Sequence, residues 1–349
     1  ASKYSFNFIY VNTVGGQDEI VFDGSSFIVD KEGKTINVCT SFSEEIYNLF
    51  SINGDFSDKS SFNYSKNIMN DESALYNAIK IGTYDYISKS NLCGVILGLS
   101  GGIDSALTLA IANDIFKKEE IEAILLPSIY TSDLSIQLAE QQCKNLNINY
   151  SLISIEDINE TVNKTLEKRF NGLQNDVTEE NIQSRARGLI LMSISNKTGK
   201  VLLTTGNKSE LAVGYSTLYG DMCGSFAPLK DLYKTEVYRL SKWRNQKSLV
   251  IPEAVIERMP TAELSYDQYD IDTLPPYETL DAILNSFIED KKSLEDICNM
   301  GFEKNLVTKI INMVIKNEYK RRQYSPGVKL NPESFGRDRR FPIVSRFKY

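Results

Sequence analysis

The stretch from Leu92 to Ala110 constrains the fold more than any other part of the sequence. An apolar run, Val95 to Leu99, has the length and composition of a buried strand. Ser100-Gly101-Gly102 follows this run, and Asp104-Ser105 opens a series of helix-forming residues. A strand, a glycine turn and a helix start leave several backbone N–H groups unpaired at one point. Together with the positive end of the helix dipole, these donors predict a site for phosphate.

Two familiar motifs can be tested against this stretch. A Walker A loop requires Lys followed by Ser or Thr after its last glycine, but Ile103-Asp104 stands there. Gly98 to Gly102 matches the G-x-S-x-G elbow of α/β-hydrolases. That serine requires a histidine as its base, and the sequence contains 0 histidines. We therefore expect a turn that holds phosphate, followed by a carboxylate, Asp104, placed to hold a magnesium ion.

The composition is that of a folded globular chain, long enough for one large domain or two smaller ones: 349 residues, 42% hydrophobic, 24% charged, net charge −7. No apolar run reaches about 18 residues, and the N-terminus lacks the layout of a signal peptide, so we expect no membrane span. The 5 cysteines form no CxxC pair. We expect reduced thiols, a cytoplasmic location and no zinc site. Without histidine, catalysis depends on metal ions, Lys, Arg, carboxylates and backbone donors.

The chain divides into two regions of different pattern. Residues 6–50 contain short strands with a hairpin turn at 30–33, and the polar stretch 51–66 is the best candidate for a linker. From about Asn70, helices and strands alternate, which predicts a doubly wound parallel sheet with right-handed crossovers. The predicted elements are helix 72–89, strand 94–99, helix 104–116, strand 121–126, a helix after Ser132-Asp133, strand 150–155, helix 179–195 and strand 201–205.

Further polar groups follow the later strands and helices. Asn181 and Arg185 lie four residues apart and suit a phosphate or a ribose, although a solvated helix face gives the same pattern. In Thr204 to Glu210, the strand–turn–helix arrangement recurs, with donors at Thr205 and a hard oxygen ligand at Glu210. Asp221 lies in a glycine-containing loop and can be a second metal ligand. Lys234 is a point charge suited to phosphate oxygens.

The last thirty residues carry more Lys and Arg than acids, in an otherwise acidic chain. This segment, 320–349, is either a solvated tail or a basic arm that closes over a polyphosphate ligand.

In this order, these motifs resemble the NAD synthetases of the N-type ATP pyrophosphatase family, from about Asp71 to Phe347. The matching segments are Leu99–Ser105, Asn181–Gly188, Thr205–Glu210, Tyr219–Asp221, Ala227–Thr235, Pro260–Leu264, Leu274–Tyr277 and Phe335–Ile343. The resemblance implies an α/β fold of the adenine nucleotide alpha hydrolase type. It also implies that ATP activates the nicotinate carboxylate of deamido-NAD as an acyl-adenylate, and that ammonia then displaces AMP.

The resemblance also implies roles for individual residues. Asp104 and Lys234 would be catalytic. The pyrophosphate would be held by Ser100, Gly101, Gly102 and Ser105, and the ATP phosphates would be contacted by Thr205, Lys234 and Thr261. The magnesium ions would be served by Asp104, Glu210 and Asp221, and the dinucleotide by Asn181 and Arg185.

The segment Tyr10–Gly24 is similar to the latter part of the nitrilase-like glutaminase domain of glutamine-dependent NAD synthetases. We therefore expect residues 1–50 to be the C-terminal remnant of such a domain, 51–66 a linker, and 67–349 the synthetase domain. The family's nucleophilic cysteine lies upstream of the matched segment, and Cys39 lies downstream of it. As written, the chain is expected to use ammonia, and a longer parent to take it from glutamine.

Two alternatives remain open on the sequence alone. One is another ATP pyrophosphatase, such as GMP synthetase or a tRNA-modifying enzyme. The other is a nucleotide-binding module without catalysis. The resemblance favours deamido-NAD, ATP and ammonia or glutamine as partners, with no nucleic acid and no membrane. It also implies a homodimer or a larger homo-oligomer.

Overall fold

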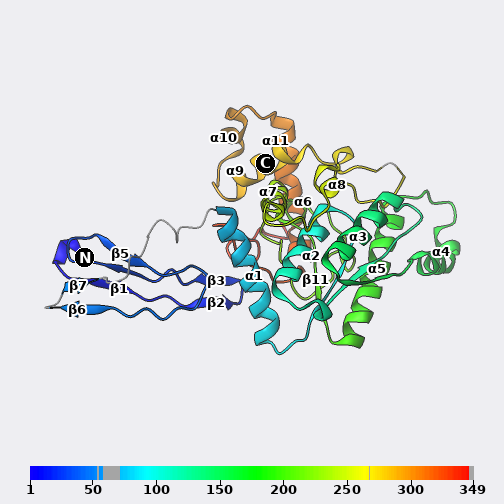
Figure 1. Cartoon of the computed structure of the whole chain (residues 1–349). Helices are drawn as coiled ribbons and strands as arrows, with labels where there is room; N and C mark the ends of the chain where they lie inside the picture. The colour runs from blue at the N-terminus through cyan, green and yellow to red at the C-terminus, as the bar shows by residue number, and fades with distance from the viewer. Residues whose placement is uncertain (53–54, 58–70, 267, 346–349) are drawn as a thin grey trace.

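The computed structural model describes residues 1–52, 55–57, 71–266 and 268–345. Figure 1 shows a β-rich N-terminal part beside a larger part in which helices surround a sheet. The N-terminal strands are all antiparallel and form a three-stranded sheet, β1-β4-β5, and two hairpins, β2-β3 and β6-β7. They are β1 (Phe8–Tyr10), β2 (Val14–Gln17), β3 (Ile20–Asp23), β4 (Phe27–Val29), β5 (Thr35–Val38), β6 (Phe50–Ile52) and β7 (Asp55–Ser57).

The central sheet has four parallel strands in the order β10-β9-β8-β11. They are β8 (Val95–Gly98), β9 (Ile121–Leu125), β10 (Asn149–Leu152) and β11 (Val201–Leu203). The chain moves outward from β8 to β9 and β10, and then returns to place β11 on the other side of β8. The strand order therefore reverses between β8 and β11, where ligands bind in sheets of this kind.

Helices cover both faces of this sheet, as the doubly wound prediction requires. They are α1 (Asp71–Lys89), α2 (Ile103–Ile115), α3 (Asp133–Leu146), α4 (Glu156–Phe170), α5 (Val177–Thr198), α6 (Lys208–Val213), α7 (Lys234–Asn245), α8 (Glu253–Glu257), α9 (Tyr277–Ile288), α10 (Leu294–Asn299), α11 (Lys304–Lys316) and α12 (Glu318–Arg321). Short 3-10 turns lie at Ser2–Tyr4, Lys118–Glu120 and Asp270–Asp272.

Alternation along the strands decides which side chains face which helices. Val95 and Leu97 of β8 belong to the large core that α1, α2, α3 and α7 cover. Ile124 of β9 faces the opposite layer, where it packs with Ala186 and Leu191 of α5. Because both faces are buried, the strands read as continuous apolar runs, which is why the sequence predicted a parallel sheet.

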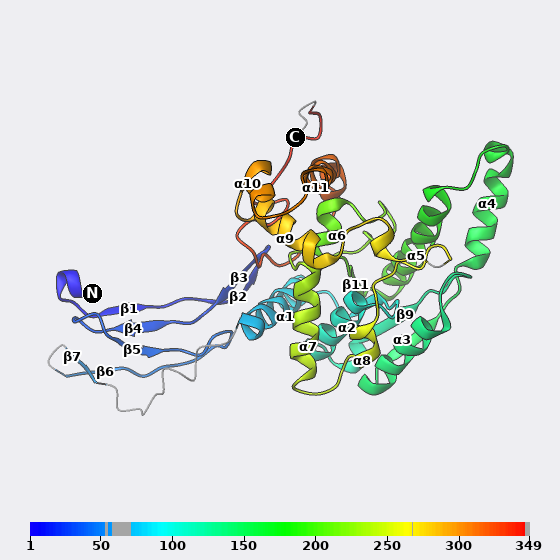
Figure 2. The same ribbon diagram turned by 90° about the horizontal axis from the view of Figure 1, so that it is seen from above.

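A second core joins the C-terminal helices. Its apolar residues come from α6, α9, α10 and α11, and from Phe335 and Phe341 near the end of the described chain. Helix α6 contributes Leu211 and Val213 to this core and begins directly after β11, so the C-terminal helices are packed on an element of the sheet's carboxyl edge. In Figure 2, these helices lie above the strands of the sheet, and α4 projects at the right, away from the N-terminal strands.

The hairpin β2-β3 is the part of the N-terminal region that packs on α1. The Gly16 N–H donates to Asp85 of α1 at 2.7 Å, and Lys89 donates back to the Gly16 carbonyl at 3.0 Å. Glu19 at the hairpin tip pairs with Lys230 at 3.0 Å, and its carbonyl accepts from the Lys329 N–H at 2.7 Å. The hairpin is therefore held by α1, by the loop before α7 and by the C-terminal segment.

The expected order of helices and strands in the α/β part is confirmed, with shifts of a few residues at the ends. Ser132 caps α3, as expected, by accepting from the Ser135 N–H at 3.2 Å. Strand β2 was not predicted, because its glycine pair gives no apolar alternation. Strands β6 and β7 fall partly within the stretch 51–66, while 53–54 and 58–66 lie outside the described residues. The domain division at that stretch stays a prediction.

The basic C-terminal segment is not a free arm where the structure describes it. Arg321 is buried and pairs with Glu318 at 3.0 Å, and Lys320 donates to the carbonyls of Gly214 and Ser216 at 2.7 and 2.6 Å. Arg337 pairs with Asp18 of the β2-β3 hairpin at 3.3 Å. These positive charges are used to fix the segment to the rest of the fold. Among the described residues, no helix combines the length and the apolar character needed to cross a membrane.

Candidate active site

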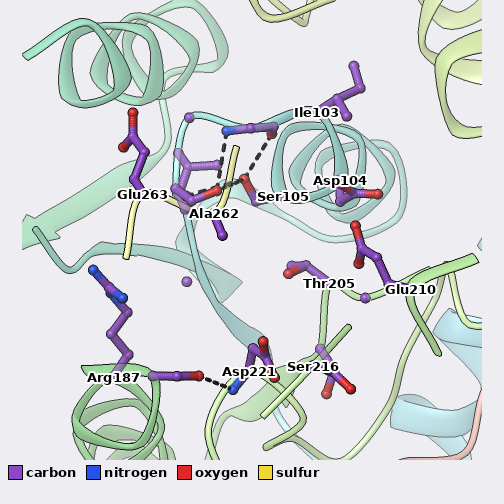
Figure 3. Close-up of a pocket in the computed structure, with 18 of the residues that line it drawn as sticks. Ile103, Asp104, Ser105, Arg187, Thr205, Glu210, Ser216, Asp221, Ala262 and Glu263 are labelled. Carbon is purple, nitrogen blue, oxygen red and sulfur yellow. Dashed lines mark hydrogen bonds between the residues drawn. The ribbon is translucent and has the colours of Figure 1, made fainter. Parts of the chain in front are cut away.

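A cavity of about 310 Å³ opens at the carboxyl ends of β8 and β11. Its walls include the end of β8 with the turn and helix start that follow it (98–105), and the end of β11 with the turn that follows it (202–207). The end of β9, one face of α5, the loop 220–223 and the segment 258–264 also line it. Figure 3 shows Asp104, Thr205 and Glu210 on one side of this space, and Arg187 and Glu263 on the other. The cavity lies at the point where the strand order reverses, so fold and site agree.

The Ser-Gly-Gly turn is held in shape by its own hydroxyls. The Ser100 N–H donates to Ser105 Oγ at 3.2 Å, and the Gly102 N–H donates to Ser100 Oγ at 3.2 Å. Gly101 has φ +81°, and a Cβ there would lie 2.4 Å from the Ser135 carbonyl, so only glycine fits. Two of the predicted phosphate donors are thus bonded within the turn, and the serine hydroxyls occupy the place of acceptors.

Three of the predicted charged residues form one cluster beside this turn. Lys234, the first residue of α7, is 3% exposed, and its Nζ lies 2.5 Å from Asp104 Oδ2 and 3.0 Å from Glu210 Oε1. Asp104 lies in the first turn of α2 and Glu210 in the first turn of α6. Three helix starts therefore bring these side chains together from distant parts of the sequence.

The cluster shifts the pKa values of its members. Burial opposes the charged form of Lys234, but the carboxylates of Asp104 and Glu210 outweigh it and raise the lysine pKa. Burial raises the pKa of Glu210 to about 7, since Asp104 and Asp270 are also close and Lys234 offsets only part of the cost. One ammonium cannot neutralise several carboxylates, so the cluster favours an additional cation or proton.

Two polar residues support the cluster from behind. Asn207, which is fully buried, donates from Nδ2 to Asp104 Oδ1 at 2.8 Å and accepts the Glu210 N–H at 3.0 Å. Its side chain thereby caps α6 and orients Asp104 at once. The backbone N–H of Lys234 donates to Ser209 Oγ at 2.8 Å, and the Ser209 hydroxyl in turn donates to Asp281 of α9 at 2.5 Å.

Asp221 lies on a different wall from Asp104 and Glu210. It faces the cavity, its Oδ1 accepts the Thr217 N–H at 2.7 Å, and removal from bulk water raises its pKa to about 6. Within the described part of the chain, no group of three His, Cys, Asp or Glu side chains is arranged to hold a metal. The three predicted metal ligands therefore do not form one preassembled cluster.

The segment 258–264 crosses the cavity near α3. Arg258 and the hydroxyls of Ser132 and Ser135 all donate to Glu263 Oε1, at 2.5, 2.8 and 2.8 Å. Thr261 lines the cavity, but its hydroxyl donates to the Gln268 carbonyl. The segment is thus fixed to the N-terminus of α3, with the Glu263 carboxylate at the positive end of that helix.

Asn181 and Arg185 do not line the main cavity in the described part of the chain. Asn181 accepts the Thr217 hydroxyl at 2.8 Å, and Arg185 donates from Nε to the Leu218 carbonyl at 3.2 Å. Leu218 lines a second hollow, which borders the main one at Met222 and Cys223. The predicted role of this pair in dinucleotide binding stays a prediction.

Sequence reasoning missed several polar residues of the cavity: Ser135, Arg187, Asn207, Arg258, Glu263 and Asp270. Asn207 carried a usable signal, since Asn before a short helix, followed three residues later by Glu, is the pattern of a helix cap. The other residues lie on elements whose orientation is set by tertiary packing, so the local sequence does not indicate which of their side chains face the cavity.

Fold and site together define a doubly wound, Rossmann-like α/β protein, with a glycine turn and a carboxylate–lysine cluster at the switch point. A family model described as NAD synthase matches residues 75–324. The chain belongs to the NAD synthase family.

The chain is similar to curated relatives over its whole length. It is 45% identical over 354 residues to the glutamine-dependent NAD(+) synthetase of Acinetobacter baylyi, covering 100% of this chain and 64% of the relative. It is 42% identical over 382 residues to the protein of the same name from Thermotoga maritima, covering 100% of this chain and 66% of the relative. The chain thus spans just under two thirds of the Acinetobacter relative.

Solved structures agree with this assignment. The glutamine-dependent NAD+ synthetase of Acinetobacter baumannii, in complex with ADP, has a TM-score of 0.68 at 42% identity, covering 98% of this chain and 62% of that one. The NH3-dependent NAD synthetase of Campylobacter jejuni has a TM-score of 0.58 at 27% identity, and the match covers 72% of this chain and 96% of that one. The doubly wound fold class is confirmed.

Proposed function

We propose that this chain catalyses the ATP-dependent amidation of deamido-NAD to NAD, as a ligase that forms a carbon–nitrogen bond. A carboxylate oxygen of the nicotinate group attacks the α-phosphorus of ATP, and the bond to the β-phosphate breaks with release of pyrophosphate. Ammonia then attacks the carbonyl carbon of the acyl-adenylate, loses a proton, and displaces AMP. Membership of the NAD synthase family supports this reaction.

The observation that carries the proposal is the cluster of Asp104, Lys234 and Glu210 beside the Ser-Gly-Gly turn. Both steps need charge neutralisation and positioning rather than a nucleophilic side chain. Lys234 would neutralise phosphate oxygens, and the N–H groups at the start of α2 would bind the pyrophosphate. Ser100 and Ser105 would give up hydrogen bonds within the turn as phosphate oxygens replace them.

The donor set of the cluster fits magnesium. Proteins usually bind Mg²⁺ through one or two carboxylates together with substrate phosphates, and Asp104 and Glu210 face the cavity beside the phosphate turn. These two carboxylates would hold the ion, and Asp221 would serve a magnesium ion separately, from a different wall of the cavity. When bound, the ion supplies charge neutralisation at the polyphosphate.

The nitrogen donor depends on the rest of the protein. We propose that the nitrogen comes from ammonia, or from glutamine by way of a nitrilase-like glutaminase domain. Residues 1–50 would then belong to that domain and 67–349 to the synthetase domain, joined at 51–66. We also propose a homodimer or larger homo-oligomer, and a cytoplasmic location.

The direct test is product analysis with ATP, Mg²⁺, ammonia and deamido-NAD. We expect AMP and NAD to form in equal amounts, and Asp104→Ala to lower the rate by at least about 100-fold with unchanged circular dichroism, because a charge beside the reacting phosphates is lost. The matched control is Asp157→Ala, which removes an exposed acid from the first turn of α4.

AMP release that requires xanthosine monophosphate or tRNA and ignores deamido-NAD would favour another ATP pyrophosphatase. Full activity of the Asp104→Ala variant would remove Asp104 from the mechanism.

A further inference from the structure

Arg187 of α5 is a cation in the cavity wall that the predicted roles do not use. Its Nε donates to the Leu126 carbonyl at the end of β9 at 3.0 Å, which directs the guanidinium into the cavity. Figure 3 shows the side chain extending from α5 toward Glu263. Among the described residues, neither terminal nitrogen of Arg187 has a hydrogen-bond or ion-pair partner.

The acids whose charges act on Arg187 are Glu263, Asp221 and Glu156, and each has another partner. Glu263 accepts from Arg258, Asp221 accepts the Thr217 N–H, and Glu156 accepts the Ile129 N–H at 2.9 Å. Arg187 is partly buried, and this burial lowers the pKa of its guanidinium.

A guanidinium that is partly removed from water without a paired anion carries a free-energy cost. Arg is also the side chain best shaped to bind an oxyanion through two parallel N–H groups. Lys234 differs, because two carboxylates already surround it. Arg187 lies against the end of β9, whereas Lys234 lies beside the helix that follows β11. The two cations therefore stand on opposite sides of the β8 turn, where a long anionic ligand would span them.

We propose that Arg187 binds an oxyanion of the ligand through its two terminal nitrogens. Two groups share this chemistry: the α-phosphate of the nucleotide and the carboxylate of the acyl substrate. The identity of these ligands rests on the proposed function, but the presence of an oxyanion site rests on the geometry of Arg187.

The test uses two matched pairs of probes with the purified chain, titrated by calorimetry. AMP and adenosine differ by the phosphate, and deamido-NAD and NAD differ by carboxylate against amide. In the unmodified chain, we expect the anionic member of at least one pair to bind more tightly. Arg187→Gln should reduce that preference by roughly 10- to 100-fold, the range for a charge-assisted bidentate contact. Arg187→Lys should keep part of the preference.

The pair that loses its preference identifies the source of the oxyanion. Arg169→Gln, which removes one exposed positive charge from α4, is the matched control and should change neither pair. The proposal is overturned if Arg187→Gln leaves both preferences intact, or weakens all four ligands equally. The titrations need no turnover, so a chain that failed to make NAD would contradict the proposed function and leave this result standing.

Discussion

Asn207 performs two tasks with one amide group. Its oxygen caps α6, and its nitrogen holds Asp104. A substitution can separate these tasks, because serine is a good helix cap but is too short to reach Asp104.

We therefore expect Asn207→Ser and Asn207→Ala to lower activity alike, by about 10- to 100-fold, the usual range for residues that orient a metal-binding carboxylate. The two variants should differ in stability by about 1 kcal/mol, because only alanine removes the cap. Steady-state rates at several Mg²⁺ concentrations and thermal melts measure the two effects. Activity that followed stability across both variants would show that Asn207 is only a cap.

Arg187 and Arg185 illustrate what the sequence could predict at this scale. Both belong to the same conspicuous motif, and the spacing of Asn181 and Arg185 correctly places that pair on one helix face. Residues two positions apart on a helix point roughly 200° apart, so only one arginine can face the cavity. The packing of α5 on β8 and β11 decides which arginine faces the cavity, and no local sequence pattern indicates that packing.

At the scale of elements, α2 and α7 are joined at both ends. Asp104 and Lys234 meet at their N-terminal ends, and Asp114 and Arg244 meet at their C-terminal ends, with Arg244 Nε and Nη2 donating to Asp114 at 2.6 and 2.8 Å. Tyr76 of α1 also donates to Asp114 at 2.8 Å. Burial opposes the charge of Asp114, but the bonds from Arg244 and Tyr76 outweigh it and lower its pKa.

We expect Asp114→Asn to destabilise the protein by about 3 kcal/mol at pH 7, since it leaves Arg244 buried without its anion. Because the pKa of Asp114 is lower in the folded state than its unfolded value of 3.8, the ionised carboxylate stabilises the fold at pH values above 3.8. This stabilisation is lost as the pH falls through the folded-state pKa. The difference between wild type and variant should therefore shrink below about pH 4. Urea unfolding midpoints at pH 7, 5 and 3 measure it.

Glu122→Gln offers a matched control for this experiment. Glu122 pairs with Lys200 at 3.2 Å, but both side chains are a fifth to a quarter exposed. Its loss should cost no more than about 1 kcal/mol. Equal costs for the two variants would mean that the bond between α2 and α7 contributes little.

The elements of the α/β part were predictable because both faces of the sheet are buried, so strands and helices carry clear apolar patterns. Among the N-terminal strands, β2 was harder to predict, since it contains two glycines and has no apolar alternation. The sequence predicted Asp104, Glu210 and Lys234 at one site, but not the direct ion pairs between them, because these side chains meet only through the tertiary fold.

At the scale of the whole molecule, Gly82 marks the point where three segments cross. It lies within α1, and a Cβ there would lie 2.4 Å from Val328 Cγ2 in the C-terminal segment and 3.1 Å from Val21 Cγ2 in the hairpin. The absence of a side chain at this position lets the hairpin and the C-terminal segment approach the same turn of α1.

We expect Gly82→Ala to separate these segments, at a cost of about 1–3 kcal/mol for overpacking that outweighs the gain in helix propensity. The hairpin should then become more sensitive to limited proteolysis, while the proposed NAD synthesis persists at low temperature. Ala78→Gly, in the same helix, is a control that changes propensity in the opposite sense. A higher melting temperature for Gly82→Ala would contradict the claim that the three segments are tightly packed at Gly82.

The double attachment of α2 and α7 has a consequence for chain connectivity. Contacts at both ends prevent α2 and α7 from sliding along or turning about one another, so side-chain contacts help to set the spacing of Asp104 and Lys234. A break or a rearranged connection in the loop between α4 and α5 would leave both ion pairs, Asp104–Lys234 and Asp114–Arg244, in place. We therefore expect the charged centre of the site to tolerate insertions in the loop 171–176 between α4 and α5, and to be sensitive to single substitutions at the far end of α2 or α7.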